Sequence, residues 1–434
     1  MPKLLVHSTD VVGATMSGPG IRAYHFAEQL REDFDVTLAA PNDPEVPIEG
    51  IDVVRTPRDA RRLRDFALAF DVVVARLLPL SVMRALASSP VQVVYDLYVP
   101  VVTEQLAMLE VERTNAAAHV FHESLLLEHR FALATGNAFV CASERQRDFL
   151  LGMLAALGRV DRDQYGRDPT LRELVDVVPF GLPDEPPAAS ARVLRGVETG
   201  IGSDDKLLIW GGGIWNWLDP DTVIRAVAGL GRDDVKLVFL GADHPDVPMM
   251  TAARRARSLV AELGVADTVL FRPGWVPYAE RGRFLLEGDI GVSAHFDTIE
   301  ARFAFRTRLL DHLWAGLPTI TTQGDALGGL VAEEGLGRAV PAGDVDAWVR
   351  SIEELLDEGE AAAVRARVEA VRPRFLWSRS TVPLRRLARQ RGEPVVARAR
   401  GAAAATRALG LRARAKVQLY GPLGVVGRRP PRRG

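Results

Sequence analysis

The sequence predicts an α/β protein made of two parallel sheets, each doubly wound by helices. Short β-branched runs alternate with segments of helical apolar spacing over about the first 180 residues. The same alternation restarts after VPFGLPDEPPAAS, whose prolines and small residues are typical of a linker. A length of 434 residues allows two or three domains, and 47% hydrophobic with 25% charged residues excludes a disordered chain. We therefore expect two similar halves in tandem.

Each predicted strand of the first half is a short apolar run. These runs are residues 4–8, 35–40, 71–75, 91–96, 138–143 and 175–181. Between them, segments such as IRAYHFAEQLRED and ERQRDFLLGMLAAL repeat apolar residues at helical spacing. Strands joined by helices pair in parallel, so a doubly wound sheet is expected.

The second half repeats this pattern. Its predicted strands are residues 206–213, 235–243, 268–275, 290–296 and 317–324, separated by helical segments such as PDTVIRAVAGL. Past residue 370 the chain continues with an arginine-rich segment, RFLWSRSTVPLRRLARQRG. The expected domains are residues 1–185 and 186–370, followed by a helix over 371–392 and a basic tail over 393–434.

Charge is distributed unevenly along the chain. The net charge is −2, but residues 391–434 hold eleven basic residues and one acid, so the 390 residues before them carry −12. A basic tail suits contact with anionic lipid headgroups, contact with RNA, or a soluble appendage. RNA is disfavoured because the body is acidic and, apart from Tyr420, the tail lacks interleaved aromatic residues.

Cysteine content and the length of apolar runs indicate the compartment. Cys141 is the single cysteine, which excludes intramolecular disulfides and multi-cysteine metal clusters. The N-terminal apolar run is too short for a signal peptide, and no uninterrupted apolar run of ~18 residues occurs. A cytoplasmic protein without a membrane span is expected.

A glycine-rich turn follows the first predicted strand. In GATMSGPGIRAYHFAEQL, Gly18 and Gly20 bracket Pro19 just before a helix. Glycine lets a ligand approach the backbone, and a new helix offers unpaired N–H groups, so the turn suits a phosphate or a sugar hydroxyl. The spacing matches neither a dinucleotide-binding motif nor a P-loop. The alternative is a turn that only connects strand to helix.

Asp96 in VVYDLYVP is a second candidate. It ends a predicted strand, and ligands of open sheets bind at the carboxyl ends of their strands. The alternative is a loop carboxylate that caps the next helix.

Residues 295–330 form the most informative stretch. A loop with Glu300, Arg306 and Arg308 precedes a helix that carries Asp311 and Trp314. Two arginines at a helix start oppose the helix dipole unless an anion compensates, which indicates a bound diphosphate. A solvated pair of arginines is the alternative.

The order of these motifs is similar to that of a known family. The chain carries the GPG loop, AFVCASERQRDFL, DVVPFGLP, LLIWGGG with DPDTVIRAVAGL, LVFLGAD, VLFRPGWVP, LLDHLWAGLPTITTQGD and GRAVPAGDVDAWVRSIEELL. Over residues 3–385 it resembles the retaining glycosyltransferases of the family 4 type, glycosyl transferases group 1. The resemblance implies the GT-B fold, in which two Rossmann-like domains face each other across a cleft and a C-terminal helix crosses back to the first domain.

The resemblance also implies roles for the acidic residues. The family's ribose-binding acid falls on Asp311, whereas the acid expected earlier in the same motif falls on Phe303. Glu300 is the candidate to supply that missing carboxylate. Asp96 matches the residue beside the reacting sugar, with Tyr95 as the alternative.

The glycine loop after the first strand of the second half departs from the family pattern. GGGIWNWLDP has none of the phosphate-binding cations usually found there, so Arg306 and Arg308 are expected to hold the diphosphate instead. Gly212, Gly213 and Asn216 are expected to line the donor site. The tryptophans of this loop either shape that site or pack in the core.

The implied activity is transfer of a sugar from a nucleotide-sugar donor to a cell-envelope polysaccharide or a lipid-linked glycan, with retention. The family needs no metal or other cofactor, and its frequent lipid-linked acceptors favour a peripheral position on the inner face of the membrane through the basic tail. No Ser-His-Asp arrangement or zinc-ligand spacing competes with this interpretation. The alternatives are a nucleotide-sugar 2-epimerase and a degenerate, non-catalytic glycan-binding or scaffold protein of the same fold.

Overall fold

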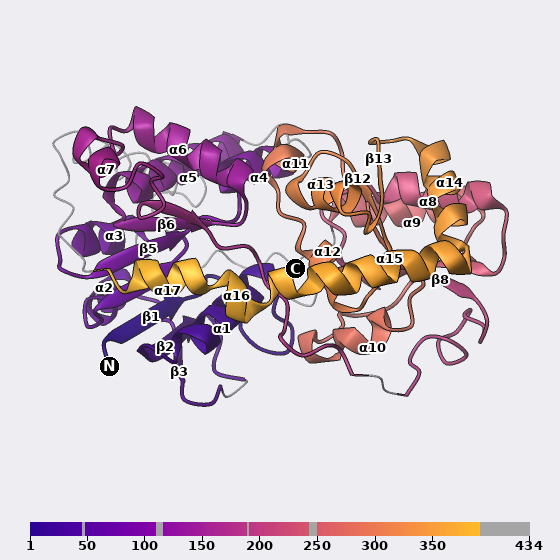
Figure 1. The fold of residues 1–434 in the computed structure, drawn as a ribbon, viewed down its shortest axis with the longest axis horizontal. Coiled ribbons are helices and arrows are strands. Elements are labelled where there is room, and N and C mark those ends of the chain that lie inside the picture. Colours follow the sequence, from indigo (N-terminus) through magenta and orange to yellow (C-terminus); the bar gives the residue numbers. More distant parts are fainter. Residues whose placement is uncertain (46–47, 110–115, 189–190, 243–249, 391–434) are drawn as a thin grey trace. The chain divides into compact units, whose positions relative to one another are not determined.

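The first half of the chain forms a parallel sheet of seven strands. In a computed structural model, which describes residues 1–45, 48–109, 116–188, 191–242 and 250–390, the strand order is β3-β2-β1-β4-β5-β6-β7. The strands are β1 (Lys3–His7), β2 (Asp35–Ala40), β3 (Asp52–Arg55), β4 (Val72–Ala75), β5 (Gln92–Asp96), β6 (Ala138–Cys141) and β7 (Val175–Val177) (Figure 1). Strand order changes direction between β1 and β4, where an open sheet leaves a crevice at its carboxyl edge.

Helices connect these strands. They are α1 (Gly18–Leu30), α2 (Ala60–Ala67), α3 (Leu80–Ala87), α4 (Val101–Leu109), α5 (Ala116–Thr135), α6 (Glu144–Ala156) and α7 (Arg162–Arg167). One buried cluster joins Leu5 of β1 and Val73 of β4 to Leu63 of α2, Met83 of α3 and Phe131 of α5. The alternating apolar residues of the strands therefore supply the core of this half.

The start of α1 differs from the prediction. Gly18 and Gly20 were expected in a turn before the helix, but they lie in its first turn, since α1 begins at Gly18. Proline fits this turn because its fixed φ is helical and its missing N–H would have no partner there.

The second half forms a parallel sheet of six strands in the order β10-β9-β8-β11-β12-β13. These are β8 (Lys206–Gly213), β9 (Val235–Gly241), β10 (Val269–Phe271), β11 (Ile290–Ser293), β12 (Thr319–Thr322) and β13 (Gly337–Val340). The helices of this half are α8 (Pro220–Leu230), α9 (Thr251–Leu263), η2 (Tyr278–Glu280), α10 (Arg281–Leu285), α11 (Ile299–Phe303), α12 (Thr307–Trp314), α13 (Ala326–Glu333), α14 (Val345–Leu356) and α15 (Glu358–Val371). The prediction of two parallel α/β sheets is confirmed.

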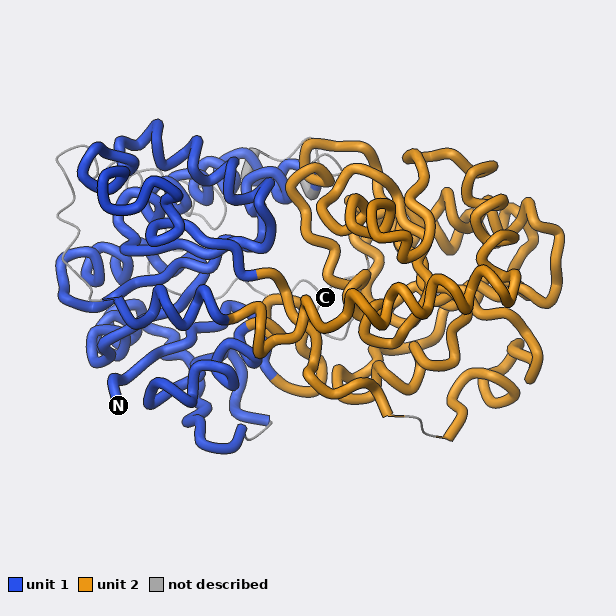
Figure 2. The backbone as a smooth tube through the Cα atoms, viewed as in Figure 1, with its two compact units in different colours: residues 1–12, 23–178, 382–434 blue, residues 13–22, 179–381 orange. Residues whose placement is uncertain are grey.

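Contacts divide the chain into two units, which are not continuous in sequence. Unit 1 holds residues 1–12, 23–178 and the chain from 382, and unit 2 holds residues 13–22 and 179–381 (Figure 2). The boundary after residue 178 lies seven residues before the one expected at 185/186. The predicted tail over 393–434 lies outside the described residues.

The segment 371–392, predicted as one helix, is broken into short pieces. They are η3 (Arg372–Phe375), α16 (Trp377–Ser380) and α17 (Val382–Ala388). Pro373 and Pro383 each stand near the start of a piece, as expected because proline is tolerated in a first turn but disrupts a helix interior.

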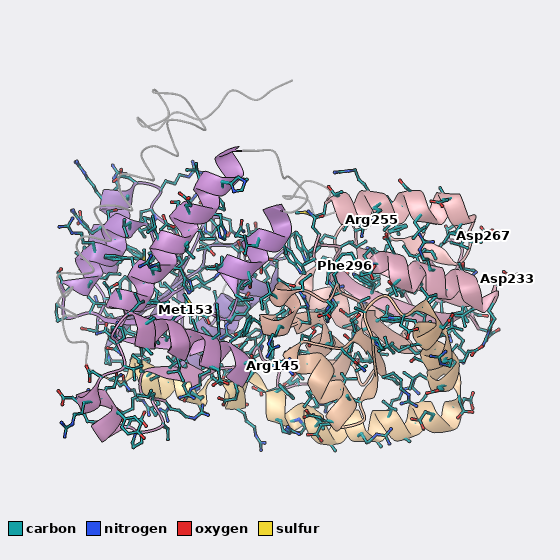
Figure 3. The ribbon with its side chains drawn as sticks, turned by 90° about the horizontal axis from the view of Figure 1, so that it is seen from above. Arg145, Met153, Asp233, Arg255, Asp267 and Phe296 are labelled. Atoms are coloured by element: carbon teal, nitrogen blue, oxygen red, sulfur yellow. The ribbon has the colours of Figure 1, made fainter. Side chains whose placement is uncertain are left out.

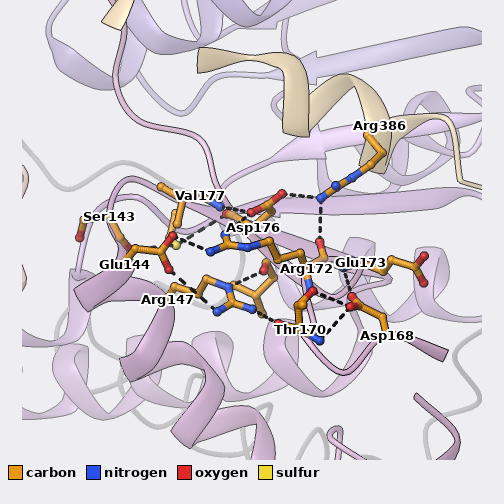
Figure 4. Close-up of polar contacts among 12 residues, drawn as sticks. Ser143, Glu144, Arg147, Asp168, Thr170, Arg172, Glu173, Asp176, Val177 and Arg386 are labelled. Atoms are coloured by element: carbon orange, nitrogen blue, oxygen red, sulfur yellow. Dashed lines mark hydrogen bonds and ion pairs between the residues drawn. The ribbon is translucent and has the colours of Figure 1, made fainter. Parts of the chain in front are cut away.

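The last of these helices, α17, belongs to unit 1. Leu384 and Leu387 are fully buried there, and the side chain of Gln92 donates to the Leu387 carbonyl at 3.1 Å. Arg386 reaches the carboxylate of Asp176 in β7 (Figure 4), which also pairs with Arg172 at 2.7 Å. The chain thus ends its described part on the first sheet.

Candidate functional site

The carboxyl end of β8 lies where the strand order of unit 2 changes direction, between β8 and β11. Gly212 has φ +73°, which favours glycine, and no atom lies within 4 Å of where a Cβ would stand. A Cβ on Gly213 would approach the Trp215 ring at 3.1 Å, and one on Gly241 would meet the Gly212 carbonyl carbon at 2.8 Å. The loop is therefore packed on one side and leaves the Gly212 backbone open.

Arg308, in the first turn of α12, places a cation against this loop. Its Nη2 donates to the Gly213 carbonyl at 2.7 Å, and its guanidinium carbon lies 4.8 Å from the centre of the Trp210 ring. Burial, and then the neighbouring Arg306, lower the pKa of Arg308 to about 9, with Asp311 opposing the shift. The group stays charged at neutral pH. Its Nη1 is buried and has no hydrogen-bond partner among the described residues.

Arg306 is instead neutralised from within the protein. It lies at the N-cap position of α12 and binds both oxygens of Glu300 in α11, at 3.0 and 2.6 Å, with both side chains buried. Its Nε lies 3.8 Å from Asp325, which itself lies 3.2 Å from the ring of His295. The expectation that a ligand anion must balance both arginines is therefore corrected for Arg306. Both oxygens of Glu300, the candidate for the missing carboxylate of the acid pair, bind Arg306.

Asp311 lies one turn after Arg308 on α12. Its Oδ1 accepts from Arg281 Nε at 2.9 Å, and its side chain keeps 36% of its exposure. The Arg281 guanidinium lies between two rings, 3.7 Å from the centre of Tyr278 and 4.2 Å from that of Trp314. The two rings hold the Arg281 guanidinium in place. Its hydrogen bond orients the Asp311 carboxylate and leaves part of that carboxylate accessible.

The loop after β8 carries Asn216 between two tryptophans. The Asn216 side-chain oxygen accepts from the backbone N–H of Ala252 at 3.1 Å, at a helix start whose own cap residue, Met250, gives no side-chain bond. Trp215 and Trp217 stack at 5.8 Å with ring planes 15° apart, and both are half-buried. Asn216 therefore holds the loop to α9, in addition to any contact with a ligand.

The outer side of α9 is also tied to this edge of the sheet. Arg255 pairs with Asp221 at 2.6 Å, and its guanidinium lies 5.7 Å from the ring of Phe296, which follows β11 (Figure 3). Arg255 already has an anionic partner and lies at the surface, so a variant of Arg255 is a suitable control for a variant of Arg308.

The glycines of the first loop belong to unit 2 by their contacts. Residues 13–22, which include Gly18 and Gly20, cluster with that unit, and the Tyr278 N–H donates to the Ala14 carbonyl at 3.0 Å. The loop is thus attached beside the residue that clamps Arg281.

Asp96 belongs to unit 1, whereas the residues described above belong to unit 2. It ends β5 with 6% of its surface exposed, and the next residue, Leu97, bonds through its backbone to Val140 of β6. Tyr95, the alternative, is buried against Phe139, and burial raises its pKa. A tyrosine so placed is a core residue.

Three features of the site have no local signal in the sequence. Arg281 stands thirty residues before Asp311, and the contact of His295 with Asp325 spans a similar length. Trp210 in β8 is fully buried in the core, and its ring lies against the guanidinium of Arg308, which is far from it in the sequence. Only the folded sheet brings these residues together.

The described residues contain no group of three or more histidine, cysteine, aspartate or glutamate side chains arranged to hold a metal ion. Among the same residues, no helix is both long enough and apolar enough to cross a bilayer.

Comparison with known proteins gives matches of two kinds. Residues 205–358 match the family described as glycosyl transferases group 1. The chain is 28% identical over 224 residues to a D-inositol 3-phosphate glycosyltransferase of Acidothermus cellulolyticus, a match that covers 50% of this chain and 47% of that protein. A protein of the same name from Saccharomonospora viridis is 26% identical over 187 residues, 42% of each chain. The matches therefore span less than half the length of these relatives.

Solved structures resemble almost the whole chain. Sucrose-phosphate synthase from Thermosynechococcus elongatus has a TM-score of 0.61 at 16% identity, over 90% of this chain and 99% of that one. HepE from Anabaena, in complex with UDP-glucose, has a TM-score of 0.62 at 12% identity, over 89% and 98%. These similarities show that the chain has the GT-B fold.

Proposed function

We propose that this protein is a glycosyltransferase of the group 1 type that uses a nucleotide-sugar donor, with the donor bound at the carboxyl edge of unit 2. The match of residues 205–358 and the GT-B fold support this proposal. The observation that carries it is the unbalanced charge of Arg308. A buried guanidinium with an N–H that has no partner in the described part of the chain, next to an open glycine backbone, is suited to an anion.

Transfer of a sugar from a nucleotide builds negative charge on the departing diphosphate. A positioned donor in a site shielded from water stabilises that charge, and loss of one such donor typically costs ~3 kcal/mol in the transition state. Arg308 has the charge for this role, and its buried Nη1 has no hydrogen-bond partner among the described residues. Arg306 supports this role of Arg308 indirectly. Its ion pair with Glu300 fixes the turn between α11 and α12.

Asp311 is the proposed ligand of the ribose hydroxyls. Its accessible carboxylate accepts hydrogen bonds, and the clamped Arg281 fixes its orientation. Gly212, Gly213, Gly18 and Gly20 are proposed to offer backbone groups to the donor. The role of Asp96 beside the reacting sugar rests on the resemblance alone.

The remaining parts of the proposal follow the family resemblance. They are retention of configuration, independence of metal and cofactor, and an acceptor that is a cell-envelope polysaccharide or a lipid-linked glycan. The basic tail is proposed to contact an anionic membrane surface from the cytoplasmic side. Membrane recovery of the full chain against a chain ending at residue 392 tests this last point.

The proposal is tested with a panel of nucleotide sugars. A donor that saturates the folded chain raises its melting temperature, because binding stabilises it by RT ln(1 + [L]/Kd). Released nucleotide with a glycosylated acceptor supports the transferase. An isomerised nucleotide sugar indicates the epimerase, and binding without release or transfer indicates the degenerate protein, for which Phe303 is the supporting observation.

A further inference from the structure

A buried histidine follows β11 at the carboxyl edge of the second sheet. His295 is fully buried, and its backbone N–H donates to the hydroxyl of Thr322 in β12 at 3.2 Å. Its backbone also forms a bridge with Leu218, in the loop that follows β8. The strands β8, β11 and β12 are neighbours in the sheet. His295 therefore lies where the chain leaves three adjacent strands, at the edge where the donor is proposed to bind.

Both ring nitrogens of His295 face oxygen atoms. Nδ1 lies 3.0 Å from the carbonyl oxygen of Phe296, and Nε2 lies 3.2 Å from Oδ2 of Asp325. A carbonyl oxygen only accepts hydrogen bonds, so Nδ1 carries a proton. An ionised carboxylate also only accepts. A neutral imidazole has one proton and satisfies one of these contacts, so a second proton is required between His295 and Asp325.

The surroundings of Asp325 favour its ionised form. Asp325 is fully buried at the N-cap of α13, where its Oδ1 accepts from the Gly328 N–H at 2.6 Å. The Nε of Arg306 lies 3.8 Å from its Oδ2. A helix N-terminus and a nearby guanidinium both stabilise a negative charge. The second proton therefore belongs on Nε2 of His295, and the ring is an imidazolium.

Three buried atoms of this group depend on charge alone. Nε2 of His295, Oδ2 of Asp325 and Nε of Arg306 make no hydrogen bond in the described part of the chain. Burying polar atoms without hydrogen bonds is costly, and a buried carboxylate in particular needs a charged partner. A neutral ring would turn the lone pair of Nε2 toward the carboxylate, whereas an imidazolium attracts it.

The charge of His295 sets the balance around Arg308. Glu300 binds Arg306 with both oxygens, and Arg306 lowers the pKa of the neighbouring Arg308. If His295 is neutral, the two arginines are cancelled by the carboxylates of Glu300 and Asp325. If His295 is an imidazolium, Asp325 is neutralised by it and the group keeps one positive charge.

We infer that His295 is a positioning residue for the donor diphosphate: as an imidazolium it neutralises Asp325, so that Arg308 keeps a positive charge for the ligand. Asp311 stands outside this balance because it pairs with Arg281. The inference rests on the proposed function in so far as the ligand is the diphosphate of a donor. His295 is assigned no contact with the ligand and no proton transfer.

Two conservative changes separate charge from shape. His295→Gln removes the imidazolium and leaves Asp325 ionised, whereas Asp325→Asn removes the carboxylate and still caps α13 through its amide oxygen. We expect His295→Gln to raise the Kd of a nucleoside diphosphate about tenfold. Asp325→Asn should keep that Kd within about twofold, and the double variant should restore the affinity that His295→Gln loses.

Calorimetry on the full chain measures these affinities. The probes are UDP, GDP and ADP, each compared with its nucleoside. The nucleoside lacks the diphosphate, so its affinity should be the same in all the variants. A purely structural role of the buried pair would give a different result, because both single variants would then weaken binding and the double variant would not restore it.

NMR of the full chain labelled with ¹⁵N at histidine detects the proton directly. At neutral pH both ring nitrogens of His295 should carry a proton. His312, whose pKa burial and Arg308 lower to about 3, should give the pattern of a neutral ring in the same spectrum. His295→Gln assigns the signal by removing it. Asp325→Asn should make His295 neutral, and this change assigns the signal even if His295→Gln does not fold.

Two results would overturn the inference. One is a neutral His295 in the unchanged chain, and the other is a loss of diphosphate affinity in Asp325→Asn as large as that in His295→Gln. Either result leaves the proposed function standing if a nucleoside diphosphate binds and Arg308→Gln weakens it. If none of the three nucleoside diphosphates binds, the proposed function fails and the diphosphate role of His295 fails with it, while NMR still decides whether the ring is charged.

Discussion

At the scale of single residues, two neighbouring arginines differ in how their charge is met. Arg306 binds both oxygens of a buried carboxylate, whereas Arg308 bonds to a backbone carbonyl and rests on an indole ring. A carbonyl and a ring offset only part of a full positive charge in a buried setting. Among the described residues, the charge of Arg306 is thus balanced by a carboxylate, whereas that of Arg308 is met only in part.

Replacing Arg308 with glutamine should therefore weaken donor binding. The charged hydrogen bond is worth about 1.5–3 kcal/mol, so the Kd of the nucleotide sugar should rise about 10–100-fold. Affinity for the parent nucleoside, which lacks the diphosphate, should not change. Calorimetry measures both, with Arg255→Gln as the control because that arginine is paired at the surface. Equal losses for donor and nucleoside would contradict the diphosphate assignment.

Replacing Glu300 with alanine should destabilise unit 2. The change leaves Arg306 buried without its partner, which costs about 3–5 kcal/mol. The exposed Glu354, whose pair with Arg338 lies at the surface, is the control, and Glu354→Ala should cost only about 0–1 kcal/mol. Urea unfolding of both variants gives the two free energies. Similar values for the two would show that the buried pair contributes no more than a surface pair.

At the scale of elements, the strands were easier to predict than their ends and edges. Each predicted strand is present, but β3 and β13 were not predicted. Both stand at a sheet edge and contain an arginine, DVVR and GRAV, so neither shows the apolar run that marks a central strand. Local sequence patterns also did not predict the contacts of the site. The segment that holds Glu300 and Arg306 was recognised, but the pairing of these two residues depends on the turn between α11 and α12.

The short helix α17 yields a prediction of its own. A chain ending after Thr381 loses the two buried leucines of α17, each worth about 1.5–3 kcal/mol, so unit 1 should be less stable by roughly 3–6 kcal/mol. A chain ending after Gln390 keeps every described contact and should melt like the full protein. Thermal unfolding of both truncations is the measurement. Equal melting temperatures for the two would show that α17 adds nothing to the first sheet.

At the scale of the whole molecule, both units contain histidines that fold in the neutral form. Burial lowers the pKa of His7 and His129 to about 4 and, together with Arg308, that of His312 to about 3. In the unfolded chain the pKa of a histidine is about 6.5. Between the folded and the unfolded pKa, the unfolded chain therefore binds more protons than the folded chain. Their contribution to stability is complete above pH 6.5 and is lost as the pH falls toward 4.

Stability should thus fall between pH 7 and pH 5 by about 1–2 kcal/mol for each of these histidines. The variant His129→Phe should remove one histidine's share of that fall. Urea unfolding at the two pH values measures the difference. A slope that His129→Phe does not reduce would show that this ring titrates alike in the folded and unfolded chains.

The discontinuity of unit 1 in sequence affects how the protein is made. Its sheet is complete once residue 177 has left the ribosome, but α17 is synthesised some two hundred residues later. The strands of unit 2 are synthesised in this interval. The second sheet is therefore able to form before α17 packs on the first. A nascent chain therefore carries an amino-terminal half that still lacks the two buried leucines of α17 while the second sheet is being made.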